Sequence, residues 1–297
     1  MKFVNRYFSL ILLSGSIAGL FLPSPGNLTN KIVIISLACV IFSSFFQISL
    51  SIKSLTSHLS VSLMFCAARF ILIPAIMFVA IKPFSHDYAT IVLLNLLVPA
   101  AVSSPAFTML FGGKTDLSLK ILLFSSFLSI FSIPFMLALF SGSETEVPVT
   151  GMLITLVWTI FVPFILHIPL RKIKPLRNFM LHRNSLIAVI FLSVLGMVVT
   201  AKNKEVILGN PALIIEYTLS ALVVFVFMYL TGYALVSRFD IGVRRALTIS
   251  SGANNAGLGV TITALFFPGE INVFFIIAQF VWVLILIPVR TWLLRMK

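Results

Sequence analysis

The sequence predicts an all-α membrane protein with several spans. Of its 297 residues, 60% are hydrophobic and 10% are charged, and the mean hydropathy is +1.14. A water-soluble domain of this length needs a more charged surface. The apolar runs are long and continuous rather than alternating segments of about 10 residues, as in a membrane β-barrel. Since only helices and closed barrels satisfy the backbone inside a bilayer, helices are expected.

About ten spans are expected, because a helix needs roughly 20 apolar residues to cross the hydrocarbon layer. They lie near Tyr7–Leu22, Ile32–Ile52, Leu59–Ile81, Ala89–Phe111, Leu117–Phe140, Val149–Leu170, Ser185–Thr200, Ala212–Val236, Val243–Phe267 and Ile271–Leu294. Lys2 and Arg6 precede the first run, as in a signal peptide, but no A-x-A-like cleavage site follows. Pro23–Gly26 is typical of a turn into the next span, so we expect the first run to be retained.

The distribution of basic residues predicts the orientation. With ten spans, both termini lie on one side of the membrane. That side holds sixteen bases: Lys2, Arg6, Lys53, Lys114, Lys120, Arg171, Lys172, Lys174, Arg177, Arg183, Arg238, Arg244, Arg245, Arg290, Arg295 and Lys297. The opposite loops hold Lys31, Lys82, Lys202 and Lys204. The positive-inside rule therefore predicts that both termini lie in the cytoplasm. The protein is expected in the plasma (inner) membrane.

The net charge of +13 does not indicate a nucleic-acid partner. The bases are spread over short loops, with no folded basic domain to present them, so lipid headgroups are the expected contacts. Cys39 and Cys66 both lie in apolar runs and are expected to be packing residues. The sequence does not predict an oligomeric state.

The chain is expected to be a single transmembrane domain over residues 1–297, made of two similar halves, about 1–143 and 144–297. The acidic connection Ser141–Val147 falls near the midpoint. Five spans in each half would make the second half an inverted copy of the first. Pro134 and Pro288 are 154 residues apart, each about twenty residues after a turn, Gly112-Gly113 or Pro268-Gly269.

Two spans carry residues that interrupt a helix. Span four contains Ser103 and Ser104 between Pro99 and Pro105, and each proline removes a backbone N–H. Span nine contains Ser250-Ser-Gly-Ala-Asn-Asn-Ala-Gly-Leu-Gly259, which is costly at membrane depth unless it faces a cavity. The alternative is a pair of kinked packing helices with small residues at the contact. Equivalent positions in both halves favour a binding site.

Arg69 lies about ten residues into the third span. A charge at that depth costs roughly 3 kcal/mol or more and should face a cavity or a partner. Two roles are open: binding a substrate carboxylate through two parallel N–H···O hydrogen bonds, or acting as a fixed cation between helix C-termini. The nearest acidic candidate is Glu216, near Pro211 and therefore expected at the interface.

Other polar residues in the spans are Gln47, Asn95, His167 and Gln279. Each is more typical of a helix–helix hydrogen bond than of a ligand, and a proton-relay role for His167 is the less expected reading. The sequence contains no phosphate loop, H-E-x-x-H motif or cysteine pair. No His or Lys lies close in sequence to the span-four serines. No enzyme and no bound metal or organic cofactor is expected.

Three segments resemble the bile acid:sodium symporter family, within the group that includes arsenite and auxin-type carriers. Gly252-Ala-Asn-Asn-Ala-Gly-Leu258 is similar to the family's Gly-x-x-Asn-x-Gly-Leu signature. The run from Pro99 to Ser118 resembles its Pro-rich crossing helix, which is followed by a glycine turn and Leu-Ser. Arg69-Phe-Ile-Leu-Ile-Pro74 resembles its third-span motif.

The resemblance implies two inverted five-helix repeats, with discontinuous helices four and nine that cross. It also implies sodium-coupled import of organic anions such as bile salts, pantoate or other carboxylates. The positions that match its ion or substrate contacts are Ser104, Ser118, Ser250, Ser251, Ala253, Asn254 and Asn255.

Three departures put sodium coupling in doubt. Pro105 stands where the family usually has Asn, Ser250 where a Glu serves sodium, and Arg69 where a Gln serves the second sodium. Losing a carboxylate and gaining a guanidinium changes the local charge by about two units, which repels a cation at low dielectric. The hypothesis is that Arg69 replaces at least one sodium ion. Coupling would then be to protons, to one remaining sodium ion, or absent.

The expected function is transport of a small organic anion by alternating access, with one bundle rocking against another. Arg69, Ser103, Ser104, Asn254 and Asn255 are the expected substrate contacts, and Gly252 and Gly257 would let helices approach. One alternative is an efflux carrier of the arsenite or auxin type. A second is a membrane sensor or assembly factor that transports nothing. The direction of transport cannot be predicted from the residues.

Overall fold

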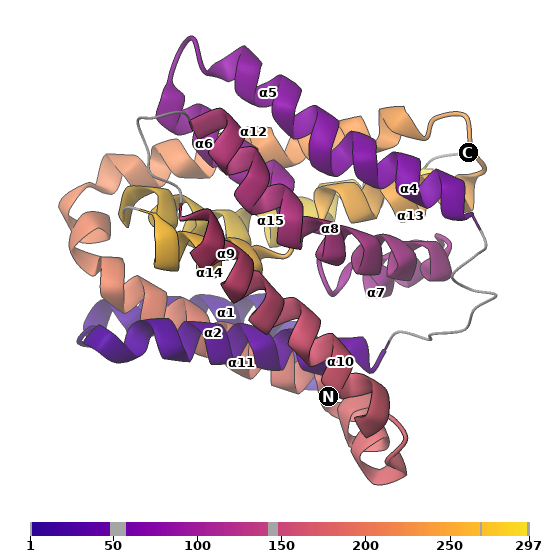
Figure 1. Cartoon of the computed structure of the whole chain (residues 1–297), viewed down its shortest axis with the longest axis horizontal. Coiled ribbons are helices and arrows are strands. Elements are labelled where there is room, and N and C mark those ends of the chain that lie inside the picture. Colours follow the sequence, from indigo (N-terminus) through magenta and orange to yellow (C-terminus); the bar gives the residue numbers. More distant parts are fainter. Residues whose placement is uncertain (1, 48–57, 142–147, 268, 296–297) are drawn as a thin grey trace. The chain divides into compact units, whose positions relative to one another are not determined.

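The computed structural model describes residues 2–47, 58–141, 148–267 and 269–295 (Figure 1). Within these ranges the regular structure is helical, apart from one isolated β-bridge. Seven described helical segments are long and apolar enough to cross a membrane: Gly26–Phe45, Leu59–Ile81, Thr115–Phe140, Val149–Leu170, Lys174–Gly209, Pro211–Leu235 and Gly269–Arg295. Shorter apolar helices cover Leu10–Phe21 and Ala256–Phe266. The protein is an all-α, multi-pass membrane protein, as the composition predicts.

The contacts divide the chain into two compact units, and each unit draws on both halves of the sequence. Unit 1 comprises Met1–Ser49, Gly151–Tyr217 and Gly257–Phe280. Unit 2 comprises Leu50–Thr150, Thr218–Ala256 and Val281–Lys297. Helices α12 (Pro211–Leu235) and α15 (Gly269–Arg295) contribute residues to both units.

In unit 1, α1 (Lys2–Phe21) and α2 (Thr29–Phe45) both pack along α11 (Lys174–Gly209) (Figure 1). Two glycines of α1, spaced four residues apart, make the close approach possible. A Cβ at Gly15 would lie 2.8 Å from the carbonyl oxygen of Ser193, and one at Gly19 would overlap the carbonyl oxygen of Met197. Small residues at this spacing let membrane helices pack backbone to backbone.

The rest of unit 1 includes α10 (Val162–Leu170), which packs on α2 and continues from α9 (Val149–Leu156) through a π-helical turn, η4 (Val157–Phe161). Helix α14 (Ala256–Phe266) also belongs largely to this unit. Lys202 of α11 donates a hydrogen bond to the carbonyl oxygen of Ala264, at a distance of 2.6 Å. The Lys202 cation pairs with a carbonyl group in the last turn of α14 and interacts favourably with the negative end of the helix dipole.

Unit 2 is built around α8 (Thr115–Ser141), which contacts α4 (Leu59–Ala67), α6 (His86–Leu97), α7 (Ser104–Leu110) and α13 (Ile241–Gly252). Helix α5 (Ile73–Ile81) continues α4 after the π-helical turn η2 (Ala68–Leu72) and packs on α6. A buried apolar cluster joins these helices: Phe65, Cys66, Phe70, Ala100, Leu117, Ile121, Val236, Val243, Ala246 and Leu247. The placement of Cys66 in this cluster agrees with its expected packing role.

Two pairs of helices from the two halves of the chain match in length. Helices α6 and α13 each contain 12 residues, and α8 and α15 each contain 27 residues. Pro134 lies 19 residues after the first residue of α8, and Pro288 lies 19 residues after the first residue of α15. In both halves the long helix follows an interrupted one.

Seven of the ten expected spans correspond to long apolar helical segments in the described residues, and one of these segments is much longer than expected. Leu59–Ile81 and Val149–Leu170 have the predicted bounds. The seventh span was expected at Ser185–Thr200, whereas α11 runs over 36 residues from Lys174 to Gly209. The polar residues at both ends continue the helix because Lys, Arg, Asn and Glu tolerate helical backbone in water. The acidic connection with Glu144 and Glu146 lies outside the described residues, as do Lys53 and Pro268.

Replacing Gly19 by alanine should destabilise unit 1, since the new Cβ would force α1 away from Met197. Overpacking of this kind costs about 1–3 kcal/mol. Thermal unfolding of the purified protein in lipid nanodiscs measures the effect as a lower melting temperature. Gly209→Ala is the matched control, because a Cβ there meets no atom within 4 Å. Equal melting temperatures for the two variants would contradict the packing argument.

Candidate functional site

The predicted interruption of span four is present between α6 and α7. Pro99 has no N–H and restricts the residue before it to extended conformations. Val98 accordingly has a ψ angle of 130°, and α6 ends at Leu97. Helix α7 begins at Ser104 with Pro105 in its first turn, where a missing N–H costs nothing.

The predicted interruption of span nine is also present. Helix α13 ends at Gly252, Ala253 has extended backbone angles, and α14 begins at Ala256. A Cβ on Gly252 would overlap the aromatic ring of Tyr229 on α12. Glycine is therefore required for the close approach at this point, as expected for Gly252.

The non-helical segments 98–103 and 253–255 pair with each other, and these paired segments form the crossing of the two interrupted spans. The backbone N–H of Ala101 donates to the carbonyl oxygen of Ala253 at 2.7 Å, and that of Asn255 donates to the carbonyl oxygen of Pro99 at 2.8 Å. These bonds flank a single antiparallel β-bridge. Backbone groups that have left their own helices thus find partners across the crossing, as buried peptide groups must. These backbone groups at the breaks are therefore engaged with each other and are not left free for a solute.

A pair of asparagine side chains lies beside the crossing. The side-chain nitrogen of Asn254 donates to Oδ1 of Asn95 at 2.9 Å. The two residues are 3% and 1% exposed, and Nδ2 of Asn95 and Oδ1 of Asn254 have no hydrogen-bond partner in the structure. One donor and one acceptor therefore remain available at this place.

Arg69 reaches the same region from the π-helical turn η2. The turn spans Ala68–Leu72, and the backbone N–H of Ile73 bonds to the carbonyl oxygen of Ala68, five residues earlier. Pro74 follows and supplies no N–H of its own. Arg69 is 0% exposed. Single π-helical turns of this kind are frequent at functional sites in membrane and soluble helices.

The guanidinium of Arg69 joins the ends of two helices. Its Nη1 donates to the carbonyl oxygen of Leu96 at 2.9 Å, in the last turn of α6. Its Nη2 donates to the carbonyl oxygen of Ser251 at 2.9 Å, in the last turn of α13, and its Nε donates to the hydroxyl of Ser251 at 2.8 Å. That hydroxyl in turn donates to the carbonyl oxygen of Met228 at 2.7 Å.

These two carbonyls are free because the helices are interrupted. In a continuous helix, the carbonyl oxygen of Leu96 would accept from the N–H of Ala100, and that of Ser251 from the N–H of Asn255. The N–H of Ala100 instead donates to the hydroxyl of Ser125 at 3.1 Å. The N–H of Asn255 pairs across the crossing. Arg69 supplies the two missing donors.

Three further serine hydroxyls form a hydrogen-bonded chain. Oγ of Ser118 on α8 donates to Oγ of Ser104 at 3.3 Å and lies 2.9 Å from Oγ of Ser250. All three residues are 0% exposed. Because a hydroxyl carries one hydrogen, Ser250 acts as the donor to Ser118 in this arrangement.

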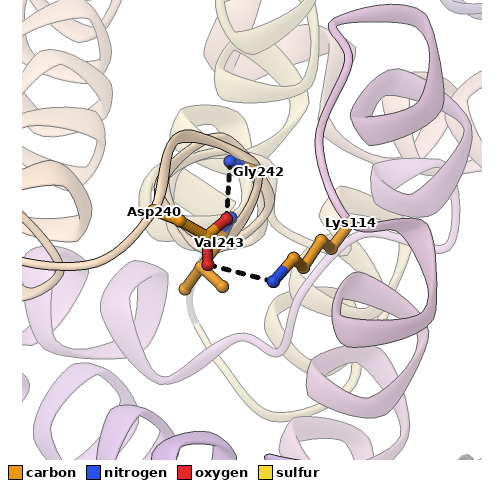
Figure 2. Close-up of polar contacts among 4 residues, drawn as sticks. All are labelled: Lys114, Asp240, Gly242 and Val243. Carbon is orange, nitrogen blue, oxygen red and sulfur yellow. Dashed lines mark hydrogen bonds and ion pairs between the residues drawn. The ribbon is translucent and has the colours of Figure 1, made fainter.

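An ion pair joins the segment after α7 to the residue that precedes α13 (Figure 2). Nζ of Lys114 pairs with Oδ2 of Asp240 at 2.9 Å, while Oδ1 of Asp240 accepts from the backbone N–H groups of Gly242 and Val243 at the start of α13. The N–H of Lys114 donates to the carbonyl oxygen of Gly242. Gly112, with a φ angle of +70°, makes the preceding turn possible. The hydrogen bond from Lys114 lowers the pKa of Asp240.

The structure brings most of the expected site residues together in unit 2. Arg69 meets Ser251, Ser104 meets Ser118 and Ser250, and Asn254 meets Asn95. Ser103 immediately precedes α7 and is half-buried, and the side chain of Asn255 is buried. The geometry favours a fixed cation between helix C-termini over a carboxylate contact for Arg69, since three of its five N–H groups are engaged and none of its surface is exposed.

The remaining polar residues are distributed elsewhere. Gln47 and Glu216 are exposed, and Gln279 is buried within unit 1. His167 is buried, its Nδ1 lies 2.7 Å from the carbonyl oxygen of Phe164, and phenylalanine rings surround it. Sequence reasoning missed Ser125, which is one of many serines in the spans and carries no local signal of its role.

A multi-pass helical membrane protein with two interrupted helices that pair at their breaks belongs to the class in which secondary transporters are found. A family model described as the Sodium Bile acid symporter family matches residues 32–210, more than half of the chain. The chain therefore belongs to this family of membrane transporters. A search of curated proteins finds no match.

The family name implies sodium, and the crossing does not fit that ion well. Sodium needs several free oxygen ligands where it leaves water for a low-dielectric site, and carboxylates or the carbonyl ends of helices supply the negative charge that offsets this cost. The sequence has no Asp or Glu between residues 88 and 115 or between 241 and 269. The carbonyl oxygen of Ala253 is engaged by Ala101, and both oxygens of Ser251 are engaged by Arg69. Ser104, Ser118 and Ser250 offer only neutral hydroxyls.

The Asp240 pair should make a pH-dependent contribution to stability. Asp240→Asn removes the ion pair and keeps an oxygen for the α13 cap. Because the pair is exposed to solvent, its loss should cost less than about 1 kcal/mol. The lowered pKa of Asp240 means that this contribution is complete above the unfolded carboxyl's pKa of about 3.9 and is lost as the pH falls through the folded value.

Melting temperatures of the wild type and Asp240→Asn, measured from pH 7 downward, should differ by a constant amount until about pH 4 and converge below it. Asp240→Ala removes the cap as well and should lower stability by about 1 kcal/mol more. A difference between wild type and Asp240→Asn that does not change with pH would show that the carboxylate charge contributes nothing.

Proposed function

We propose that this protein is a secondary active transporter that carries a small organic anion, a carboxylate of the bile-acid or pantoate kind, by alternating access. The observation that supports this proposal above the others is the paired interruption of two helices within unit 2. Non-helical backbone at membrane depth is stable only where protein or a cavity surrounds it. Two compact units with separate internal contacts provide the two bodies that such a movement needs.

The proposed topology has ten spans in two inverted five-helix repeats. The seven long apolar segments, α1 and the two interrupted spans together make ten. The matched lengths of α6 with α13 and of α8 with α15, and the equal positions of Pro134 and Pro288, support the repeat. The bias of Lys and Arg supports cytoplasmic termini in an inner, plasma membrane.

The charge of the crossing favours an anionic solute. Arg69 places a positive charge beside the two breaks, and the sequence has no Asp or Glu at positions 88–115 or 241–269 around them. Opposite charge is attracted strongly where the dielectric is low. Ser103, Asn254 and Asn255, with the unpaired amide atoms of Asn95 and Asn254, are the groups proposed to contact the solute. Arg69 is proposed to contribute through its field and through the shape of the crossing.

Uptake of labelled organic acids into liposomes that contain the purified protein tests the proposal. Candidate acids are first selected by the rise in melting temperature that a bound ligand produces. Ser103→Ala and Asn255→Ala should reduce uptake about tenfold or more, as expected when a hydrogen bond to a charged group is lost. Inside-out vesicles separate import from export.

Ser129→Ala is the matched control for this experiment. Ser129 is buried on α8 and its hydroxyl bonds only within its own helix, to the carbonyl oxygen of Ser126 at 2.8 Å. Its uptake should remain close to that of the wild type. If no organic acid raises the melting temperature or enters the liposomes, the proposal that the protein carries an organic anion is wrong.

A further inference from the structure

Arg69 is a fully buried cation whose hydrogen-bond partners in the structure are all neutral. Among the described residues, ion pairs include Lys114 with Asp240 and Lys120 with Asp116, and no carboxylate pairs with Arg69. A guanidinium that has left water requires compensation. Arg69 obtains it from two carbonyl oxygens and one hydroxyl oxygen.

The two carbonyls are not ordinary backbone acceptors. Each lies in the last turn of a helix that ends at the crossing, where unpaired C=O groups carry the negative end of the helix dipole, about half an elementary charge. Helices α6 and α13 both direct such an end at the same guanidinium, through Leu96 and Ser251. Two partial negative charges thus face one full positive charge.

Oxygens arranged in this way also bind small mobile cations. Carbonyl oxygens at the C-terminal ends of interrupted helices are the usual ligands for coupling ions in transporters. Leu96 and Ser251 would offer such an ion two carbonyl oxygens and one hydroxyl oxygen. In this protein the guanidinium already takes all three.

We propose that Arg69 is a covalently attached substitute for a mobile cation at the paired ends of α6 and α13. Its charge is present at every stage of the cycle, because the guanidinium of arginine is not deprotonated in proteins. No ion gradient can deliver energy at this position. For its consequence in transport this inference rests on the proposed function, whereas the cation site itself does not.

Removing the fixed charge should create a sodium site. In Arg69→Gln the oxygens of Leu96 and Ser251 lose their donors, and the glutamine can add one further oxygen. The melting temperature of Arg69→Gln, with choline chloride as the only salt, should fall by more than about 5 °C relative to wild type. Replacing choline by sodium at equal ionic strength should recover at least half of that loss, while the wild type should respond little.

Lys120→Gln is the matched control. Lys120 is also buried, at 2% exposure, and lies on α8 in the same unit, 4.0 Å from Asp116. Its removal should lower the melting temperature without a sodium-specific recovery. Arg69→Lys keeps a charge and should show no recovery either.

Equal sodium responses in wild type and Arg69→Gln would overturn the proposal. An Arg69→Gln protein that remains unfolded in both salts would overturn it as well, because no mobile cation could then take the place of the guanidinium. The measurement requires no transport. A chain that moves no organic acid would therefore contradict the proposed function and leave this result standing.

Discussion

The need to pair buried backbone groups governs the structure around the two breaks. Interrupting α6 and α13 inside an apolar unit leaves carbonyls and N–H groups without helical partners. An unpaired peptide group in such surroundings costs several kcal/mol. Three solutions occur together: the two segments bond to each other, Ser125 accepts from Ala100, and Arg69 donates to Leu96 and Ser251. Each depends on the others, because the guanidinium can reach both carbonyls only when the breaks lie side by side.

This arrangement separates two functions that a mobile ion would combine. A coupling ion both stabilises the helix ends and carries energy from a gradient. A buried arginine performs the first of these tasks permanently. The hydroxyls of Ser104, Ser118 and Ser250 lie next to the same segments and satisfy one another without any charge. Under the proposed function, solute binding would therefore not require an ion to bind first at the ends of α6 and α13.

Much of the fold could be predicted from composition and local pattern, whereas the contacts at the site could not. Continuous apolar runs predicted the bounds of Leu59–Ile81 and Val149–Leu170, and Pro99, Pro105 and Gly252 predicted the breaks. The length of α11 was underestimated, because its polar ends remain helical beyond the apolar part. The partners of Arg69 lie 27 and 182 residues away. No periodicity or spacing encodes such pairs, and the assignment of Ser125 and Asn95 needed coordinates.

The ion pair of Lys114 with Asp240 has a mechanical consequence. It joins the turn after α7 to the first residues of α13, and the backbone bond from Lys114 to Gly242 strengthens the junction. At the other end of α13, the paired breaks and Arg69 connect it to α6. Helix α13 is thus anchored at both ends to segments of the first half of the chain. The two interrupted spans are therefore linked at both ends of α13, and a displacement of one would require the same displacement of the other.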